Sequence, residues 1–472
     1  MKRSGTDGGV GIQNLSLKIF ELMPEALADV DDFAADVSGG CRGWPRRLLW
    51  ASTALAIFVG PVDIVADGGT MTVGLDPVVA VKLGTALIAM IWSAWGLATC
   101  RGVRELVLSM PALLLFGILF LVLLATPRAV SSASAATALI NTTYVVFIAT
   151  SLVGLGIRGT VSAMTVGMFV YTCCAWGLYL TMPRYGVFPE DLGGGLIVYR
   201  LGGMGHPNGV SRAICLGLIL SVWLWKSGRI PTRWFALVAP VFAVAAYLAW
   251  SRTSLVATAI ALLILWADQI LRRRVVAAIT VLAMVGITTL TVVWMAGYGE
   301  SIAEIALSKL TKTGSTEELT TGTGRAEIWA YSIDLIRQRP WIGHGFNAGP
   351  TLLERFSQST HNAVLHASLA GGVVAGGFMV VLLIVTLNLV LTGGHPLIRA
   401  VAFFVLISCL LEETVLETFP GPCTLTWLMC LFYPTYAWMQ RHNREASDLA
   451  NRRQAMLKAP TAGISTSPSP SH

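Results

Sequence analysis

The chain is dominated by apolar runs of about 20 residues, the length that an α-helix needs to cross the hydrocarbon core of a bilayer. They lie at residues 47–66, 77–100, 106–126, 135–156, 159–180, 209–226, 233–250, 254–271, 275–298, 363–391, 397–417 and 421–439. Backbone groups in lipid have no water to bond, and no barrel-like alternation is present, so each run is predicted to be a helix. We therefore expect an all-α, polytopic integral membrane protein with about twelve transmembrane helices.

The composition excludes two broad classes of protein. The chain is 54% hydrophobic and only 12% charged, whereas a soluble globular chain of this length has to wet a large surface. The net charge of +7 does not indicate a nucleic-acid partner, because the basic residues sort to the ends of helices rather than onto one soluble face.

The Lys and Arg residues of the short connections predict the orientation, because cytoplasmic loops carry the excess of positive charge. Alternate connections are basic, at Arg46 and Arg47, Arg101 and Arg104, Arg158, Lys226, Arg229 and Arg233, Arg272 to Arg274, Arg399, and Arg441 and Arg444. These ends and both termini are assigned to the cytoplasm. One turn departs from the alternation, since Arg252 falls on the outer face, where a lone Arg is often only a contact for lipid headgroups.

Five parts follow from this topology. They are a cytoplasmic N-terminal tail (1–46), helices one to nine (47–298), a large outer loop (299–362), helices ten to twelve (363–439) and a cytoplasmic C-terminal tail (440–472). The end of that last tail is rich in Pro, Ser and Thr, which is typical of disorder. No Cys lies in the large loop, so we expect neither a disulfide framework nor a thiolate metal site.

The predicted outer face gathers cations and histidines. They are Arg184, Arg200, His206, Arg212, Arg252, Arg325, Arg337, Arg339, His344, Arg355 and His361. Arg stays charged at any relevant pH and presents a rigid fork of donors that suits phosphate oxygens. Several Arg at one membrane surface indicate a diphosphate ligand, and the alternative is nonspecific contact with anionic headgroups.

Five short segments occur in a particular order along the second half of the chain. They are Trp250–Leu255 around Arg252, Gly324–Trp329, Pro340–Phe346, His361–Leu365 and the small-residue run 369–377. This ordered series resembles the O-antigen ligase and polymerase superfamily of bacterial membrane proteins. The topology agrees, because that family has about a dozen helices and a large outer loop late in the chain.

The resemblance implies an inner-membrane, multi-pass glycosyltransferase of lipopolysaccharide or exopolysaccharide biosynthesis. Its donor would be a glycan on a polyprenyl (undecaprenyl) diphosphate, used on the periplasmic face without a metal ion or other cofactor. The acceptor would be a lipid A core (a ligase) or a second lipid-linked glycan (a polymerase), and the sequence leaves this choice open. Membrane lipids and other polysaccharide assembly proteins are the further partners expected.

Carried onto this chain, the family pattern matches two candidate catalytic residues, Arg252 and His361. Fixed guanidinium groups of Arg200 and Arg252 would neutralise the leaving diphosphate, and His361 would act as the base for the acceptor hydroxyl. The full set of candidate substrate-binding residues is Arg200, His206, Asn208, Arg212, Arg325 and Asn362.

Structural roles compete with several of these assignments. His361 and Asn362 could instead cap the next helix, and residues 325–336 have the spacing of an amphipathic helix on the membrane surface or over the bundle. Trp329 and Trp341 are expected as interface anchors, and His344 as a turn residue.

Three carboxylates remain, Glu412, Glu413 and Glu417. They lie near the predicted outer end of a helix, where they are expected to pair with the outer Arg set, and they hold second claim to catalysis. Lys82, within the second span, can reach the surface or pair, and the sequence does not decide.

The main alternative from another class is a polysaccharide transporter or flippase. Two halves of six helices would put the longest connection near the middle of the chain and would resemble one another. Here the longest loop follows the ninth span, no internal repeat is found, and charged residues avoid the centres of the spans. The transferase is therefore the favoured hypothesis.

Overall fold

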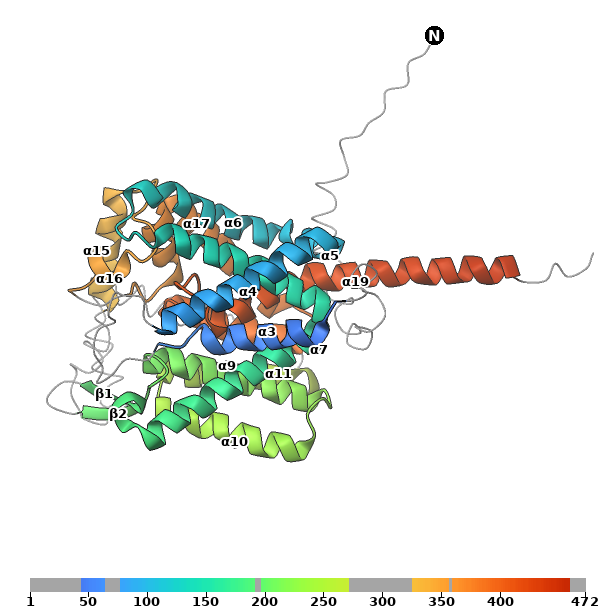
Figure 1. Cartoon of the computed structure of the whole chain (residues 1–472), viewed down its shortest axis with the longest axis horizontal. Coiled ribbons are helices and arrows are strands. Elements are labelled where there is room, and N and C mark those ends of the chain that lie inside the picture. The colour runs from blue at the N-terminus through green and yellow to red at the C-terminus, as the bar shows by residue number, and fades with distance from the viewer. Residues whose placement is uncertain (1–43, 64–76, 192–196, 271–324, 356–358, 459–472) are drawn as a thin grey trace, which may run out of the picture.

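The computed structural model describes residues 44–63, 77–191, 197–270, 325–355 and 359–458 and shows a mostly helical protein (Figure 1). Its helices are α3 (Arg46–Val59), α4 (Pro77–Thr99), α5 (Arg101–Val107), α6 (Met110–Ala125), η3 (Thr126–Arg128), α7 (Ser134–Thr181), α8 (Pro183–Gly186), α9 (Pro207–Lys226), α10 (Thr232–Ala249), α11 (Arg252–Ile270), α15 (Arg325–Gln338), α16 (Gly349–Leu352), α17 (Ala363–Thr392), α18 (Pro396–Leu411) and α19 (Pro422–Lys458). The two strands are β1 (Val187–Asp191) and β2 (Ile197–Leu201). Several predictions fall outside the described residues: the N-terminal tail up to residue 43, the span at 275–298, the first part of the large loop (299–324) and the end of the C-terminal tail (459–472).

Six of the described helices are long and apolar enough to cross a membrane, namely α4, α6 with η3, α7, α9, α10 and α17. The shorter apolar helices α11 and α18 accompany them. This arrangement is that of a polytopic membrane protein. Helix α7 is two helices that meet at Gly156, where the backbone has φ 70°, and the sequence had predicted two separate spans on either side of that residue.

Three expectations need correction. Strands β1 and β2 pair antiparallel, with Phe188 opposite Arg200, so the loop before α9 carries a small hairpin and the fold is not purely helical. Helix α18 ends at Leu411, so the three carboxylates lie in the connection that follows it. Helix α17 was predicted as one continuous span, but its helical geometry is interrupted at Gly372.

The interruption of α17 is packed against the segment around Pro340. At Gly372 φ is +82°, a conformation that favours glycine, and a Cβ there would lie 2.6 Å from the Trp341 carbonyl carbon. The turn after α15 supplies the hydrogen bonds that the broken helix lacks: Val373 N donates to Pro340 O (2.7 Å) and His344 N to Leu369 O (2.7 Å). Broken backbone within a membrane protein requires such partners. The turn and the break therefore form one unit.

Helix α15 packs over α17 by the apolar stripe that its sequence predicted. Ile328, Trp329, Leu335 and Ile336 are buried in a cluster with Leu369 of α17. The indole of Trp329 is 8% exposed and donates to Thr360 O at 3.0 Å, so the prediction of Trp329 as an interface anchor is wrong.

The other two residues of this segment differ in their surroundings. Trp341 is 70% exposed, in keeping with an anchor. His344 is buried, and its Nε2 lies 2.9 Å from Leu335 O. The side chain of His344 thus joins its turn to α15, as expected for a turn residue.

Helix α18 lies at the centre of the bundle, since every residue from Leu397 to Cys409 is buried. Helices α4 and α10 are the least buried of the long spans and lie on outer faces (Figure 1). The hairpin, α15 and α16 gather at one end of the molecule, and α5 and the last part of α19 lie at the opposite end (Figure 1). Because α18 lies at the centre of the bundle, the connection that follows it begins there.

Candidate functional site

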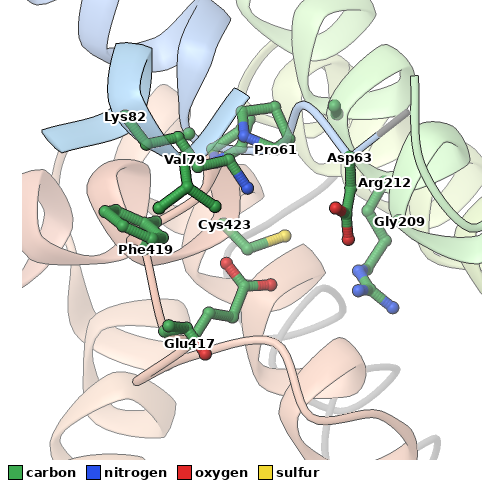
Figure 2. Close-up of a pocket in the computed structure, with 13 residues that line it drawn as sticks. Pro61, Asp63, Val79, Lys82, Gly209, Arg212, Glu417, Phe419 and Cys423 are labelled. Carbon is green, nitrogen blue, oxygen red and sulfur yellow. The ribbon is translucent and has the colours of Figure 1, made fainter. Parts of the chain in front are cut away.

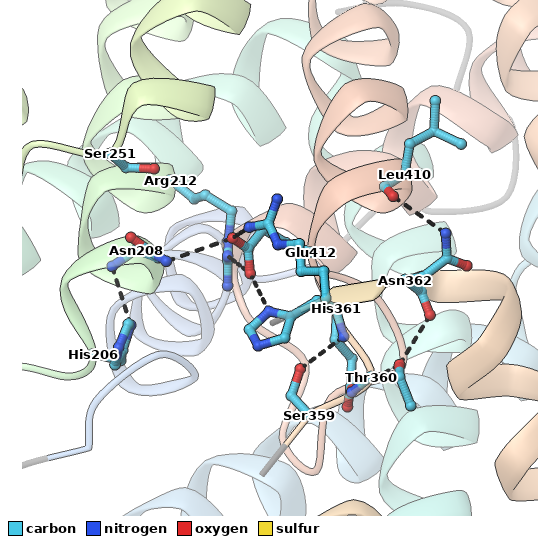
Figure 3. Close-up of polar contacts among 12 residues, drawn as sticks. His206, Asn208, Arg212, Ser251, Ser359, Thr360, His361, Asn362, Leu410 and Glu412 are labelled. Atoms are coloured by element: carbon cyan, nitrogen blue, oxygen red, sulfur yellow. Dashed lines mark hydrogen bonds and ion pairs between the residues drawn. The ribbon is translucent and has the colours of Figure 1, made fainter. Parts of the chain in front are cut away.

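Glu412 is the centre of a charged cluster at the exit of α18 (Figure 3). Its Oε1 accepts from Arg325 Nη2 at 2.6 Å, and its Oε2 lies 2.9 Å from His361 Nδ1 and 3.8 Å from Arg212 Nη1. Asn208 Nδ2 makes a longer contact of 3.5 Å with Oε1. Four residues predicted as site residues are therefore brought to one carboxylate.

Separate parts of the chain deliver these side chains. Arg212 lies in the first turns of α9, Arg325 opens α15, and His361 directly precedes the cap of α17. Helix α18 is buried on all sides, and Glu412 is the first residue after it. Glu412 therefore lies among the elements that carry these side chains. A carboxylate in this position is costly to leave unpaired, and the two guanidinium groups compensate it.

The electrostatics of Glu412 follow from these partners. Burial alone would raise its pKa, but the hydrogen bond with His361 and the charges of Arg212 and Arg325 outweigh that effect and lower the pKa to about 2. Glu412 is therefore a carboxylate at any physiological pH. Two guanidinium groups, those of Arg212 and Arg325, face this one carboxylate.

His361 is held by its backbone as well as by its ring. Its φ is +50°, a left-handed conformation uncommon for a residue with a side chain, and its N–H donates to Ser359 Oγ at 3.1 Å. With Nδ1 donating to the Glu412 carboxylate, the neutral imidazole carries its lone pair on Nε2. This is the arrangement in which a carboxylate orients a histidine base.

Asn362 performs the capping role that the sequence offered as an alternative. Its Oδ1 accepts from Val364 N (3.0 Å) and Leu365 N (3.1 Å), and its Nδ2 donates to Leu410 O (3.2 Å). Asn362 therefore fixes the start of α17 against the end of α18. It sets the position of His361 without joining the Glu412 cluster.

Glu413 and His366 make a second pair beside the first. His366 Nδ1 lies 2.9 Å from Glu413 Oε1, and His366 Nε2 lies 3.2 Å from Leu416 O. Glu413 Oε2 also accepts from Thr360 N at 3.1 Å. This pair ties the segment before α17 to the connection after α18.

The part played by His366 was missed in the sequence. A usable signal was present, because a histidine within a run predicted to cross the membrane demands a polar partner. The adjacent pair of carboxylates at 412 and 413 offered one partner for each of two histidines. In the structure Glu412 pairs with His361 and Glu413 with His366.

Arg200 is buried and reaches the cluster only indirectly. Its Nε and Nη2 both donate to Ala249 O, at 2.9 and 2.7 Å, and Nη2 donates to Asn208 Oδ1 at 2.9 Å. Its Nη1 is paired with Glu190 on the neighbouring strand. Arg200 thus joins the hairpin to the end of α10 and, through Asn208, to the site.

His206 is the N-cap of α9, where its Nδ1 accepts from Asn208 N at 3.3 Å. Its ring packs edge-on against Phe188 of the hairpin. Burial, followed by the charge of Arg200, lowers the pKa of His206, which favours the neutral ring that this cap requires. His206 is therefore placed next to the cluster but is not drawn into it.

Arg252 opens α11 with an exposed side chain. The chain reaches it through Trp250, which has φ +49° and caps α10 in a left-handed conformation. Ser251, directly before Arg252, faces Asn208 and Arg212 in the site (Figure 3). The structure thus brings Arg252 to the same end of the molecule as the Glu412 cluster.

Within the described residues, no group of three His, Cys, Asp or Glu side chains has the arrangement of a metal site. The groups around Glu412 are cationic or amide hydrogen-bond donors, and such groups suit an anionic ligand. Bundle and cluster together define a polytopic membrane protein with a dense group of Arg, His and Glu side chains at one end.

Residues 237–380 match the family model described as O-Antigen ligase. The resemblance drawn from the sequence motifs is confirmed over this region. No curated protein and no solved structure matches the chain.

The matched region contains three elements of the site, namely Arg252, Arg325 and the His361–Asn362 pair. Its limits exclude Arg212 and Glu412, which the fold adds from either side. The geometry therefore extends the site beyond the part of the chain that the family defines.

Proposed function

We propose that this protein is a glycosyltransferase that moves a glycan from a polyprenyl diphosphate to an acceptor sugar. The acceptor is a lipid A core or a second lipid-linked glycan, in lipopolysaccharide or exopolysaccharide biosynthesis. The family match supports the class of reaction. The observation that carries the proposal is the convergence of two arginines and a histidine on Glu412.

The reaction needs two things from the protein. An acceptor hydroxyl has to lose its proton as its oxygen attacks the anomeric carbon, and the diphosphate has to leave with the electron pair of the broken C–O bond. Nε2 of His361 accepts that proton, which a positioned base near neutral pH does effectively. The products are the new glycoside, the polyprenyl diphosphate and a proton that His361 returns to water.

The leaving diphosphate is stabilised by fixed guanidinium groups. We assign this role to Arg212, Arg325 and Arg252, whose charges are already in place before negative charge develops on the leaving oxygen. Glu412 holds two of them and orients His361, so it is a positioning residue. Arg200, His206, Asn208 and Asn362 act through hydrogen bonds that fix α9 and α17 around the substrate.

The proposed side of the reaction is the periplasmic face of the bacterial inner membrane. The basic connections that mark a cytoplasmic face include Arg101 and Arg104 of α5, and α5 lies at the end of the molecule opposite to α15 and α16 (Figure 1). A reporter enzyme fused after Thr351 is expected to be periplasmic, and one fused after Leu108 cytoplasmic. The reverse result would separate the site from its donor.

The test is transfer by the purified protein in detergent, supplied with a polyprenyl diphosphate-linked oligosaccharide and each acceptor in turn. Product on the lipid A core identifies a ligase, and a ladder of lengthening lipid-linked glycans identifies a polymerase. Activity is expected to persist in a chelator of divalent cations. Absence of product with both acceptors would contradict the proposal.

Arg252→Lys tests the arginine assignment while keeping the charge. Loss of a bidentate contact to phosphate is expected to reduce transfer tens of fold, because a point ammonium cannot replace the guanidinium fork. The matched control is Arg101→Lys in α5, whose guanidinium is exposed and pairs with Glu105. Unchanged transfer by Arg252→Lys would reduce Arg252 to a lipid contact.

A further inference from the structure

A second polar cavity lies on the other side of Arg212. Its volume is about 320 Å³, and its charged lining residues are Asp63, Lys82, Arg212 and Glu417. Figure 2 shows these four side chains around one space, with Phe419 below Lys82. The residues come from the end of α3, from α4, from α9 and from the connection after α18. None of the groups except Arg212 takes part in the mechanism above.

The side chain of Glu417 lines this cavity. From the described residues its side chain receives one hydrogen bond, from Gly421 N to Oε2 at 2.9 Å. Its own carbonyl accepts from Asn141 Nδ2 at 3.0 Å, which fixes the backbone of the residue against α7. The carboxylate is thus anchored at one oxygen, and Oε1 is left to accept from a molecule in the cavity.

The charge balance of the cavity selects the chemistry of that molecule. Two carboxylates, Asp63 and Glu417, line the cavity together with Lys82 and Arg212, and Arg212 is shared with Glu412. A diphosphate placed here would therefore meet two negative groups at short range. A neutral molecule with many hydroxyl groups meets no such penalty. Carboxylates accept strong, charge-assisted hydrogen bonds from hydroxyls.

Phe419 supplies the apolar surface that a sugar ring also needs. Lys82 Nζ lies 5.3 Å from the centre of the Phe419 ring, so the ring is held at the edge of the cavity. The remaining lining includes Pro61, Val79 and Pro422. Polar groups interspersed with apolar lining residues are typical of sites for small ligands.

We infer that this cavity is a subsite for one sugar ring of a substrate, with Glu417 and Asp63 accepting hydrogen bonds from its hydroxyl groups. The inference rests on the proposed function, since it gives the glycan a place beside the diphosphate. Arg212 links the cavity to the Glu412 cluster, since it lines the cavity and its Nη1 lies 3.8 Å from Glu412 Oε2. The sugar belongs to either the donor or the acceptor, and the experiment separates the two.

Protection from a carbodiimide provides a readout that does not depend on catalysis. Dicyclohexylcarbodiimide modifies protonated carboxyl groups in apolar surroundings. Burial raises the pKa of Glu417 to about 7, so near neutral pH both the carboxylate that accepts from a sugar and the protonated form that is labelled are present. Mass spectrometry of the full-length protein in detergent locates the adduct, and Glu417→Gln removes it. The probes are the lipid-linked oligosaccharide, the lipid A core, polyprenyl diphosphate without a glycan, and inorganic diphosphate.

A sugar-bearing probe is expected to protect Glu417 at least severalfold, and the probe that protects identifies the source of the sugar. Protection by inorganic diphosphate or by polyprenyl diphosphate alone would overturn the inference, as would labelling unaffected by every probe. This outcome differs from failure of the proposed function, which is the absence of transfer by the unmodified protein.

Kinetics give the second measurement. Glu417→Gln keeps the shape of the side chain and its bond from Gly421 N, but it weakens the acceptor for a hydroxyl. Loss of one charge-assisted hydrogen bond is expected to raise the KM of the protecting substrate about tenfold with kcat nearly unchanged. The matched control is Glu105→Gln in α5, which should leave both constants unchanged. A collapse of kcat at constant KM would make Glu417 catalytic and overturn the subsite.

Discussion

Glu412 and Glu417 lie five positions apart in one connection, yet their surroundings give them opposite properties. Glu412 meets two guanidinium groups and His361, and its pKa falls to about 2 despite burial. Burial raises the pKa of Glu417 to about 7, because the charges of Arg212 and Lys82 offset only part of the effect of burial. The residue type alone therefore does not set the role of a carboxylate. The elements that converge on each carboxylate do.

The two sides also differ in which parts of the chain build them. The partners of Glu412 come from α9, α15 and the segment before α17. The cavity of Glu417 is lined by the segment after α3, by α4 and α9, and by the connection after α18 with the start of α19. Among the described residues that contact Glu412, Arg212 of α9 alone also lines the Glu417 cavity. Changes in α15 or α17 should therefore reach the first side and spare the second.

The largest expected effect is that of Glu412→Gln. An amide cannot hold two guanidinium groups and fix the His361 tautomer, so kcat should fall by about 100-fold or more. Glu417→Gln should leave kcat within about twofold in the same transfer assay. Equal losses of kcat in the two variants would show that Glu412 and Glu417 do not have different roles.

A smaller loss is expected for Arg325→Lys. The lysine keeps the charge but loses the fork that bonds Glu412 and phosphate, so kcat should fall tens of fold. Because Arg325 does not line the Glu417 cavity, protection of Glu417 from the carbodiimide by a sugar should be unchanged. Loss of that protection would show that the two sides are not separate.

Gly372→Ala tests the link between α17 and the Glu412 side. With φ at +82° and backbone atoms of the Pro340–Trp341 turn in the way, the variant should lose about 1–3 kcal/mol of stability. Thermal unfolding in detergent measures this loss. The matched control is Gly377→Ala in the same helix, where an added Cβ meets open space. Equal melting temperatures for the two variants would contradict the account of the break.

The smallest effect is a difference in pH dependence. A carboxyl whose pKa rises from 4.5 to about 7 on folding favours the folded state while protonated, so its contribution to stability declines as pH rises from about 4.5 to about 7. Glu417→Gln should abolish that decline. Glu412, with a pKa of about 2, contributes stability above 4.5 that is lost only as pH falls towards 2. Its removal should therefore shift the melting temperature equally at pH 6 and pH 8.

Much of the fold followed from the sequence because its signals are local. Apolar run length predicted the long helices, and the spans on either side of Gly156 were correctly separated. The stripe of Ile328 and Ile336 predicted a helix either on the membrane surface or over the bundle, and α15 packs over the bundle. The hairpin before α9 carried no comparable periodic signal in its five-residue strands, so an all-helical fold was expected.

The site was harder to predict because its partners are distant in sequence. The family resemblance selected His361, and residue chemistry selected Arg212 and Arg325. The carboxylate that joins them was ranked second, since nothing local distinguishes Glu412 from Glu413. The break at Gly372 was also missed, because glycine is common in spans. The turn that packs against the break lies about 30 residues earlier in the sequence, at Pro340–Trp341.

The central claim is that Glu412 and His361 act as one unit in glycan transfer. It is tested by measuring kcat for the purified protein with His361→Ala, Glu412→Gln and the double variant, against the same lipid-linked donor and acceptor. Residues that act as a unit are grossly non-additive. The account predicts that the double variant is no slower than His361→Ala alone. Losses that multiply in the double variant, or full activity in either single variant, would contradict it.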